Sequence, residues 1–398
     1  MKINTDQKMI DEFLDRGVEN VYPSRDFLAA RLKEGKQLTI YLGIDPTGPT
    51  LHLGHAINLR KLKLFQELGH KVILLIGDFT GMIGDPTDKS ATRKMLTREQ
   101  VLENAKLYQT QALKFISFDG ENAAELKYNS EWLAEMRLRE VVGLASNFTV
   151  QQFLERDMFE KRMIEGKPIH IHEFLYPLMQ AYDSVAMDVD GEIGGNDQTF
   201  NMLAGRDLMK ALKSKEKFVI TMKLLTDPTG KKMGKSEGNM ITLMDSAEEM
   251  FGKVMSWTDE MIAGGLEIIT DLSSEEQKEV LAMPNPRDQK ARLAFEVVKN
   301  FHSAEAAETA RENFDKMFRD KEVPDEMPEF KLSEAKNIID VLVETNLAPS
   351  KSEARRLIDG GGVKVGGEVI TGYDFIVQSA NEGVVIQKGK RGFVRVTK

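Results

Sequence analysis

The segment from Gln37 to Gly77 constrains the fold most strongly, because strand and helix patterns follow one another directly within it. Gln37–Gly43 alternates apolar and polar residues, which predicts a strand. Gly54–Leu68 has apolar residues at helical spacing and stops at Gly69, and Lys71–Gly77 is a compact apolar strand. Consecutive strands joined by a helix predict a parallel βαβ unit whose sheet is covered on both faces.

The pattern repeats after a long helical stretch. We interpret 97–180 as mostly helical, Ser184–Ile193 as a strand, Asp197–Leu212 as a helix and Phe218–Leu225 as a strand. These elements predict the second half of the same sheet. The sequence therefore indicates an α/β fold, a Rossmann-like doubly wound parallel sheet over residues 1–245 with a helical insertion at about 97–180.

The remainder divides into three parts. Residues 246–320 have a helical pattern throughout, and 321–331 are charged, contain Pro324 and Pro328 and show no periodicity, which is typical of a linker. Beyond them, 332–398 predicts a small α+β module with short helices at about 334–345 and 350–359. Its short strands follow Gly360-Gly361-Gly362.

Composition sets the class of protein. A chain of 398 residues is long for one core, so two or three domains are expected. Because it has no cysteine, it offers no disulfide, no thiolate metal site and no cysteine nucleophile. Its longest apolar run, Val72–Ile76, is far too short to cross a membrane, and Met1–Asp6 lacks the apolar core of a signal peptide. We expect a cytoplasmic protein with no membrane partner.

The charge is unevenly distributed. A formal net charge of −9 argues against a protein that coats nucleic acid through bulk electrostatics, and no DNA partner is expected. Residues 332–398, however, contain 10 Lys and Arg against 8 Asp and Glu. Since selective RNA contact needs only a local basic face, the total charge does not exclude it.

The first candidate motif is Leu51-His52-Leu53-Gly54-His55, at the predicted start of a helix. Unpaired helix N–H groups favour phosphate there, Gly54 allows close approach of a ligand, and His52 and His55 share one face of the first turn. Alone, two such histidines are more often caps or core residues. The turn-rich loop Gly43–Thr50 after the first strand favours the ligand-binding interpretation, because α/β sheets bind ligands at such loops.

The second motif is Gly230-Lys231-Lys232-Met233-Gly234-Lys235-Ser236. It has three residues between its glycines, where a P-loop needs four, and no clear helix follows it. We therefore reject a P-loop and predict a mobile lysine loop that closes over a triphosphate, where it would neutralise charge as pyrophosphate leaves. A solvated basic loop is the alternative.

Several segments carry a family resemblance. His52-Leu53-Gly54-His55 and Lys232-Met233-Gly234-Lys235-Ser236 resemble the two signature sequences of class I aminoacyl-tRNA synthetases. Four others narrow the resemblance to the bacterial tyrosyl-tRNA synthetases: Tyr41–Thr47, Ile83–Pro86, Tyr176–Asp183 and Gly194–Gln198. The tail, about 332–398, resembles an RNA-binding module shared with a ribosomal small-subunit protein.

The resemblance implies a function and a set of site residues. L-tyrosine would attack the α-phosphate of ATP, and the tyrosyl group would then pass to the 3′ end of tRNA(Tyr). The implied catalytic residues are Thr47, His52, His55, Lys232 and Lys235. The implied ATP-binding residues are Gly43, Asp45, Gly54, Gly194, Gly195, Asp197, Lys235 and Ser236. The implied tyrosine-binding residues are Tyr41 and Asp183 at the phenol, with Asp85, Tyr176, Gln180 and Gln198 around the ammonium group.

The resemblance also implies Mg²⁺ accompanying ATP and a homodimer whose interface comes from the insertion. His170-Ile171-His172-Glu173 is not the zinc motif His-Glu-x-x-His and has no cysteine beside it, so no protein-bound metal is expected. Two alternatives stay open. One is activation of tryptophan on the same fold, which Asp183 with Tyr41 disfavours. The other is a catalytically silent RNA-binding protein, which the intact motifs disfavour.

Overall fold

The computed structural model divides the chain into two compact units, Met1–Ala304 and Glu305–Lys398. It describes residues 3–87, 95–227, 240–316, 327–332, 334–378, 383–389 and 392–398. The predicted lysine loop, with Lys232, Lys235 and Ser236, lies outside these ranges. None of the described helices is long and apolar enough to cross a membrane.

A six-stranded sheet forms the centre of the first unit, in the order β1-β6-β5-β2-β3-β4. The strands are β1 (Val18–Tyr22), β2 (Thr39–Ile44), β3 (Lys71–Ile76), β4 (Glu125–Tyr128), β5 (Gly191–Gly195) and β6 (Phe218–Met222). All neighbours run parallel except β1, which pairs antiparallel with β6 at one edge. The predicted Rossmann-like parallel sheet is confirmed, with one antiparallel edge strand that the sequence pattern did not reveal.

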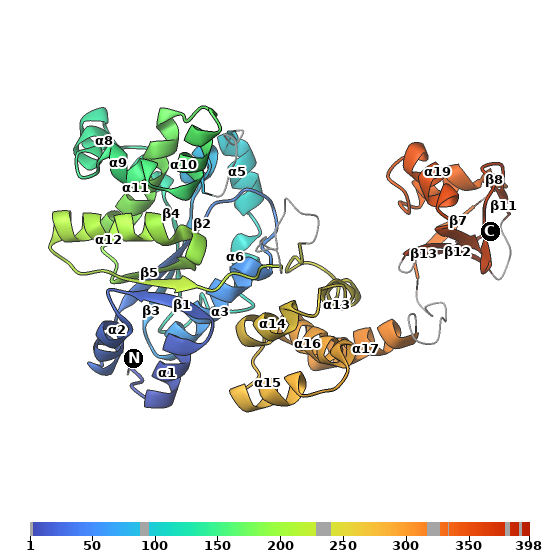
Figure 1. Cartoon of the computed structure of the whole chain (residues 1–398), viewed down its shortest axis with the longest axis horizontal. Coiled ribbons are helices and arrows are strands. Elements are labelled where there is room, and N and C mark those ends of the chain that lie inside the picture. Colours follow the sequence, from blue (N-terminus) through green and yellow to red (C-terminus); the bar gives the residue numbers. More distant parts are fainter. Residues whose placement is uncertain are drawn as a thin grey trace. The chain divides into compact units, whose positions relative to one another are not determined.

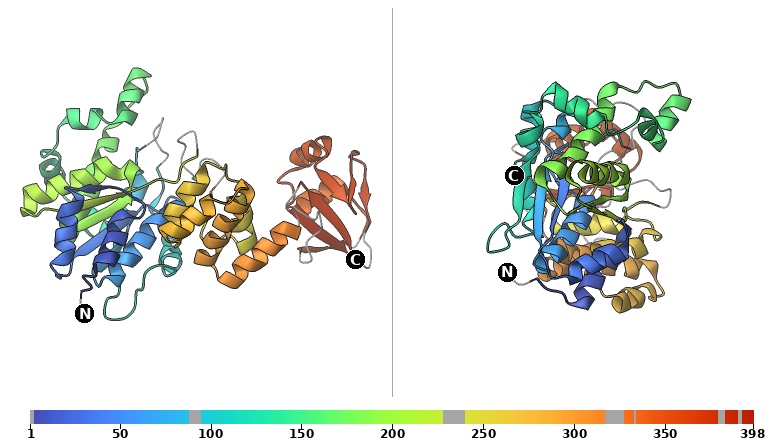
Figure 2. Two further views of the ribbon diagram at one scale, coloured as in Figure 1. Left: turned by 60° about the horizontal axis from the view of Figure 1, so that its bottom comes forward. Right: turned by 90° about the vertical axis from the view of Figure 1, so that its left-hand side faces the viewer.

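The predicted βαβ unit is confirmed almost residue for residue. Strands β2 and β3 pair in parallel from Thr39 opposite Lys71 to Ile44 opposite Ile76, and α3 (Leu53–Glu67) connects them. Every residue of β3 after Lys71 is buried, as expected for a strand with both faces covered. Figures 1 and 2 show α11 (Ile171–Met187) and α12 (Thr199–Lys213) on one side of the sheet, with α1 (Gln7–Asp15) and α3 on the other.

The segment 97–180 is mostly helical, as predicted, but β4 also lies within it and pairs with β3. Four half-buried residues are too few to show an alternating pattern. The predicted strand from Ser184 begins only at Gly191, since α11 continues to Met187 and ends at Asp188 in the left-handed conformation. The apolar run that starts at Val185 fits the period of a strand as well as that of a helix.

The remaining helices of the insertion and of the helical region follow the prediction. The insertion contains α5 (Arg98–Ala105), α6 (Tyr108–Ala112), α7 (Ser130–Leu133), α8 (Leu138–Ala145), α9 (Val150–Leu154) and α10 (Asp157–Ile164). The helical region contains α13 (Ala247–Met255), α14 (Met261–Ile269), α15 (Ser274–Leu281), α16 (Pro286–Phe301) and α17 (Ala304–Asp315). Local signals set the boundaries: Asn285 caps α16 through the N–H of Arg287, and Pro286 occupies its first position.

The second unit has a core of its own. Helices α18 (Ile338–Glu344) and α19 (Lys351–Asp359) pack on a sheet in the order β10-β9-β12-β13-β7. Its strands are β7 (Glu329–Lys331), β9 (Val363–Val365), β10 (Glu368–Val369), β12 (Val384–Lys388) and β13 (Gly392–Thr397), and β8 (Lys336–Asn337) pairs separately with β11 (Ile376–Val377). Strand β7 lies within the segment predicted as a linker, so this sheet begins before residue 332.

His70 provides a test of the packing in the first unit. Its ring is buried against Phe65, and its Nδ1 accepts a hydrogen bond from the backbone N–H of Leu38 (3.2 Å). Burial lowers the pKa of His70 to about 4. Because the unfolded chain binds this proton more readily, the contribution of His70 to stability is complete above pH 6.5 and is lost as the pH falls toward 4.

We therefore expect the free energy of unfolding to fall by about 1–2 kcal/mol more in the wild type than in His70→Asn between pH 7.5 and 5.0. Urea unfolding followed by tryptophan fluorescence measures this in the first unit, which contains both tryptophans, Trp132 and Trp257. An identical pH dependence of the two proteins would contradict the buried neutral imidazole.

Candidate functional site

A cavity of about 680 Å³ lies at the carboxyl ends of the central strands. All fifteen predicted site residues that the structure describes line it. They are Tyr41, Gly43, Asp45, Thr47, His52, Gly54, His55, Asp85, Tyr176, Gln180, Asp183, Gly194, Gly195, Asp197 and Gln198. Segments more than 150 residues apart in the sequence thus meet in one place, because parallel strands end at the same edge of a sheet.

The two histidines form the N-terminal end of α3. His52 caps the helix, its Nδ1 accepting from the N–H of Gly54 (3.1 Å), and the Nδ1 of His55 accepts from the N–H of His52 (3.2 Å). Their ring centroids are 4.0 Å apart. Since both Nδ1 atoms accept, each neutral ring carries its proton on Nε2.

Burial keeps these imidazoles neutral. It lowers the pKa of His52 to about 4, and together with the neighbouring His52 it holds the pKa of His55 well below its ordinary value. A Cβ at Gly54 would lie 2.9 Å from Cε1 of His52, so the glycine gives the ring its space. The end of the helix therefore offers two Nε2–H donors, without a fixed charge on either ring.

Asp45 lies in the loop after β2, and two hydroxyl groups hold its carboxylate in place. The hydroxyl of Thr80 donates to its Oδ1 (2.7 Å), and the hydroxyl of Tyr176 donates to its Oδ2 (2.9 Å). Burial and the nearby Asp45 raise the pKa of Tyr176 well above its ordinary value, so this phenol stays a donor. A Cβ at Gly77 would come within 2.0 Å of the Asp45 carboxylate, which explains the glycine there.

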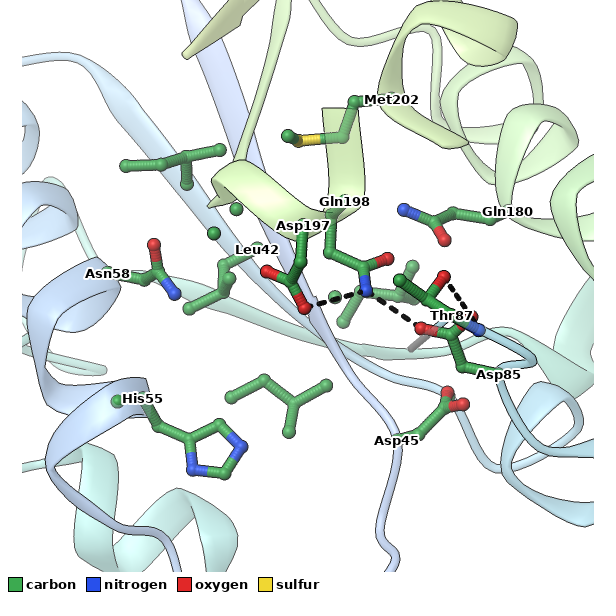
Figure 3. Close-up of a pocket in the computed structure, with 18 of the residues that line it drawn as sticks. Leu42, Asp45, His55, Asn58, Asp85, Thr87, Gln180, Asp197, Gln198 and Met202 are labelled. Atoms are coloured by element: carbon green, nitrogen blue, oxygen red, sulfur yellow. Dashed lines mark hydrogen bonds between the residues drawn. The ribbon is translucent and has the colours of Figure 1, made fainter. Parts of the chain in front are cut away.

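A second carboxylate, that of Asp85, faces the cavity from the opposite wall to His55 (Figure 3). The backbone N–H and hydroxyl of Thr87 donate to its Oδ1 (2.9 and 2.6 Å), and the amide of Gln198 donates to its Oδ2 (2.7 Å). Asp197 lies beside Gln198 in Figure 3. An oriented carboxylate of this kind suits a small cation such as an ammonium group.

The buried end of the cavity contains Tyr41 and Asp183. Trp132 Nε1 donates to Asp183 Oδ1 (2.8 Å) and Asn129 Nδ2 donates to Oδ2 (3.3 Å). Burial raises the pKa of Asp183 well above its ordinary value, although both donors oppose the shift. The hydroxyl of Tyr41 lies 3.1 Å from that of Ser184. Both carboxyl oxygens accept hydrogen bonds here, and beside a phenol they fit a ligand with a hydroxyl group at this depth.

Asn129 and Trp132 were not predicted from the sequence. Asn129 immediately follows β4, the strand that the helical interpretation of 97–180 overlooked. Polar residues directly after parallel strands are the signal that would have identified it.

Among the described residues, no group of three or more His, Cys, Asp or Glu side chains is arranged to hold a metal ion. In the His170-Ile171-His172-Glu173 segment, the Glu173 carboxylate binds Arg162 instead, at 2.5 Å from Nη1. The buried pair thus gives Glu173 a structural partner.

Comparisons with known proteins indicate the same family for both parts of the chain. The family model of tRNA synthetases class I (W and Y) matches residues 33–319, and that of the tyrosine–tRNA ligase SYY-like C-terminal domain matches 320–396. The tyrosine–tRNA ligase of Thermotoga maritima is 49% identical over 380 residues, covering 94% of each chain. That of Carboxydothermus hydrogenoformans is 45% identical over 402 residues, covering 97% of each.

Solved structures show the same fold. A C-terminally truncated mitochondrial tyrosyl-tRNA synthetase from Aspergillus nidulans superposes with a TM-score of 0.65 at 23% identity, covering 79% of this chain and 95% of that one. Tyrosyl-tRNA synthetase from Archaeoglobus fulgidus, complexed with L-tyrosine, gives 0.60 at 21% identity, covering 77% and 100%.

Proposed function

The chain belongs to the tyrosine–tRNA ligases of the class I tRNA synthetase family, and we propose that its cavity forms tyrosyl-adenylate from L-tyrosine and ATP before tyrosine passes to tRNA(Tyr). One observation supports this most. The same cavity has a buried phenol–carboxyl pair, Tyr41 and Asp183, and two imidazole donors at a helix N-terminus.

For tyrosine, we propose that its phenol lies between Tyr41 and Asp183, because Asp183 accepts the phenolic proton. The ammonium group would face Asp85, with Tyr176, Gln180 and Gln198 around it. Phenylalanine would form neither the hydrogen bond with Tyr41 nor the one with Asp183, at a cost of about 1–3 kcal/mol each. The pocket would therefore reject it.

For ATP, we propose that the phosphates face His52, His55 and Thr47, and that Gly43 and Gly54 leave room for the nucleotide. Asp197 and the backbone of Gly194 and Gly195 would hold the ribose, and Asp45 would also contribute to ATP binding. Lys232, Lys235 and Ser236 would approach from the loop outside the described residues. Mg²⁺ would arrive with the ATP phosphates and neutralise part of their charge.

The reaction needs no protein nucleophile. A carboxylate oxygen of tyrosine attacks the α-phosphorus while the bond to the pyrophosphate oxygen breaks. The chain's contribution is to align these groups and to donate hydrogen bonds to the phosphoryl oxygens as charge develops on them. Neutral Nε2–H donors, fixed through their Nδ1 atoms, are suited to this because they need no reorganisation.

ATP–pyrophosphate exchange with tyrosine, tryptophan and phenylalanine tests the proposal. We expect tyrosine to be preferred over phenylalanine by at least about 10²-fold in kcat/KM, from the unpaired groups at Tyr41 and Asp183. Preference for tryptophan would show that the ring pocket is misassigned. Absence of exchange with all three amino acids, in folded protein, would favour a catalytically silent RNA-binding protein.

We propose that the second unit contacts tRNA. Lys351, Arg355 and Arg356 are exposed on α19, and residues 332–398 have more basic than acidic side chains. Such a local basic face suits phosphate contacts. The cytoplasm, where tRNA and ATP meet, is the proposed location.

Replacing Arg355 and Arg356 together by serine should weaken charging of tRNA(Tyr) and leave pyrophosphate exchange unchanged. The dependence of tRNA affinity on salt should decrease by about one phosphate contact per arginine. Filter binding across a salt series measures this. An unchanged salt slope would remove α19 from the RNA interface.

A homodimer is also proposed. Five large apolar side chains of the insertion are each more than 60% exposed in the single chain: Leu138, Val142, Val150, Ile164 and Ile171. Large exposed apolar side chains gathered in one part of a chain are typical of an interface. Sedimentation of a species with the mass of one chain at micromolar concentration would contradict it.

A further inference from the structure

A buried ion pair lies directly beneath the ring end of the cavity. Lys217, the residue before β6, is fully buried, and its ammonium group binds the carboxylate of Glu192 on β5. It also reaches the hydroxyl of Ser184 (2.7 Å) and the carbonyl of Met202 (3.3 Å). Neither the sequence motifs nor the proposed chemistry uses Lys217.

The ammonium group fixes the direction of the hydrogen bonds around it. It has three hydrogens and accepts none, and both the Met202 carbonyl and the Glu192 carboxylate can only accept. Its remaining hydrogen goes to the oxygen of Ser184. The hydroxyl hydrogen of Ser184 is then directed away from Lys217. The hydroxyl oxygen of Tyr41 lies 3.1 Å from that of Ser184, within reach of this hydrogen.

Tyr41 consequently accepts from Ser184 and keeps its own hydrogen to donate. Within the protein, the Glu192 carboxylate is the competing acceptor for this hydrogen. Both Glu192 oxygens already accept bonds, one from Lys217 and the other from the amide of Gln180 (3.0 Å). Because Glu192 is paired with Lys217, it competes less strongly for the hydroxyl hydrogen of Tyr41.

We propose that Lys217 is a positioning residue that determines specificity by holding Tyr41 as a hydrogen-bond donor to the phenol oxygen of the substrate. The substrate hydroxyl then donates to Asp183, and the chain of donors runs in one direction from Lys217 to Asp183. The inference rests on the proposed function, since it concerns recognition of the tyrosine ring.

The space around Lys217 supports this role. A Cβ at Gly205, in the interior of α12, would lie 2.6 Å from the Lys217 ammonium and 3.0 Å from the Ser184 hydroxyl. Glycine inside a helix costs about 1 kcal/mol relative to alanine, so the helix gives up stability where the ammonium group needs room. A buried ion pair often adds little stability, because removing two charges from water costs about as much as their attraction gains. This favours a role for Lys217 in directing hydrogen bonds over a purely structural one.

Two variants test the proposal without leaving a lone buried charge. Lys217→Met with Glu192→Gln removes both charges, and Gly205→Ala displaces the ammonium group while keeping it. In pyrophosphate exchange we expect the tyrosine-to-phenylalanine ratio of kcat/KM to fall about 10-fold, the equivalent of one hydrogen bond, through loss of activity with tyrosine. The KM for ATP should not change.

Matched controls lie away from the cavity. Arg162→Met with Glu173→Gln removes another buried ion pair, and Gly264→Ala fills open space on α14. Both should keep the wild-type ratio. If the Lys217 double variant does not fold, Ser184→Ala interrupts the same chain by removing one hydroxyl, and it should lower the ratio likewise.

An unchanged ratio, with both amino acids affected equally, would overturn the role of Lys217. Failure of the proposed function is distinguishable, because the wild-type protein would then show no preference for tyrosine at all.

Discussion

The parallel pairing of β2 with β3 and β5 is the constraint on which the site depends. It places the carboxyl ends of three strands at one edge, and the chain leaves each strand there through a loop that carries polar side chains. The start of α3 after β2 brings His52 and His55 to this edge. Asp85 follows β3, and Asp197 follows β5, so three separate segments line one cavity.

The electrostatic character of the cavity follows from burial as much as from residue type. Five carboxyl groups line it, those of Asp45, Asp85, Asp183, Glu192 and Asp197, whereas its two histidines are kept neutral. Hydroxyl, amide and indole donors orient the first three carboxyl groups. With the proposed function, such a cavity would orient an amino acid by its ammonium and hydroxyl groups and would meet phosphate with hydrogen bonds. Among the described residues, Lys223 also lines the cavity, but it is paired with Glu267. We propose that Lys232, Lys235 and Mg²⁺ supply most of the positive charge for the phosphates.

The residues that line the cavity could be predicted from the sequence more completely than the helices and strands around them. Glycines, prolines and polar residues after strong strands, such as Asp45–Gly48 after β2, mark positions whose chemistry is local. Strand β4 was missed because four half-buried residues show no periodicity, and with it Asn129 and Trp132 were missed. The Lys217–Glu192 pair could not be predicted, because nothing local distinguishes a buried lysine before a strand from a solvated one. Its partner comes from a neighbouring strand, and only tertiary pairing shows it.

The central claim is that the neutral imidazoles at the start of α3 donate to the phosphates of ATP in the same cavity that binds tyrosine. Rapid-quench measurement of adenylate formation by His55→Ala tests it most directly. We expect the rate to fall by roughly 10²-fold, as for the loss of one donor to the transition state, with an unchanged Kd for tyrosine. An unchanged rate, or a loss explained entirely by weaker tyrosine binding, would contradict it.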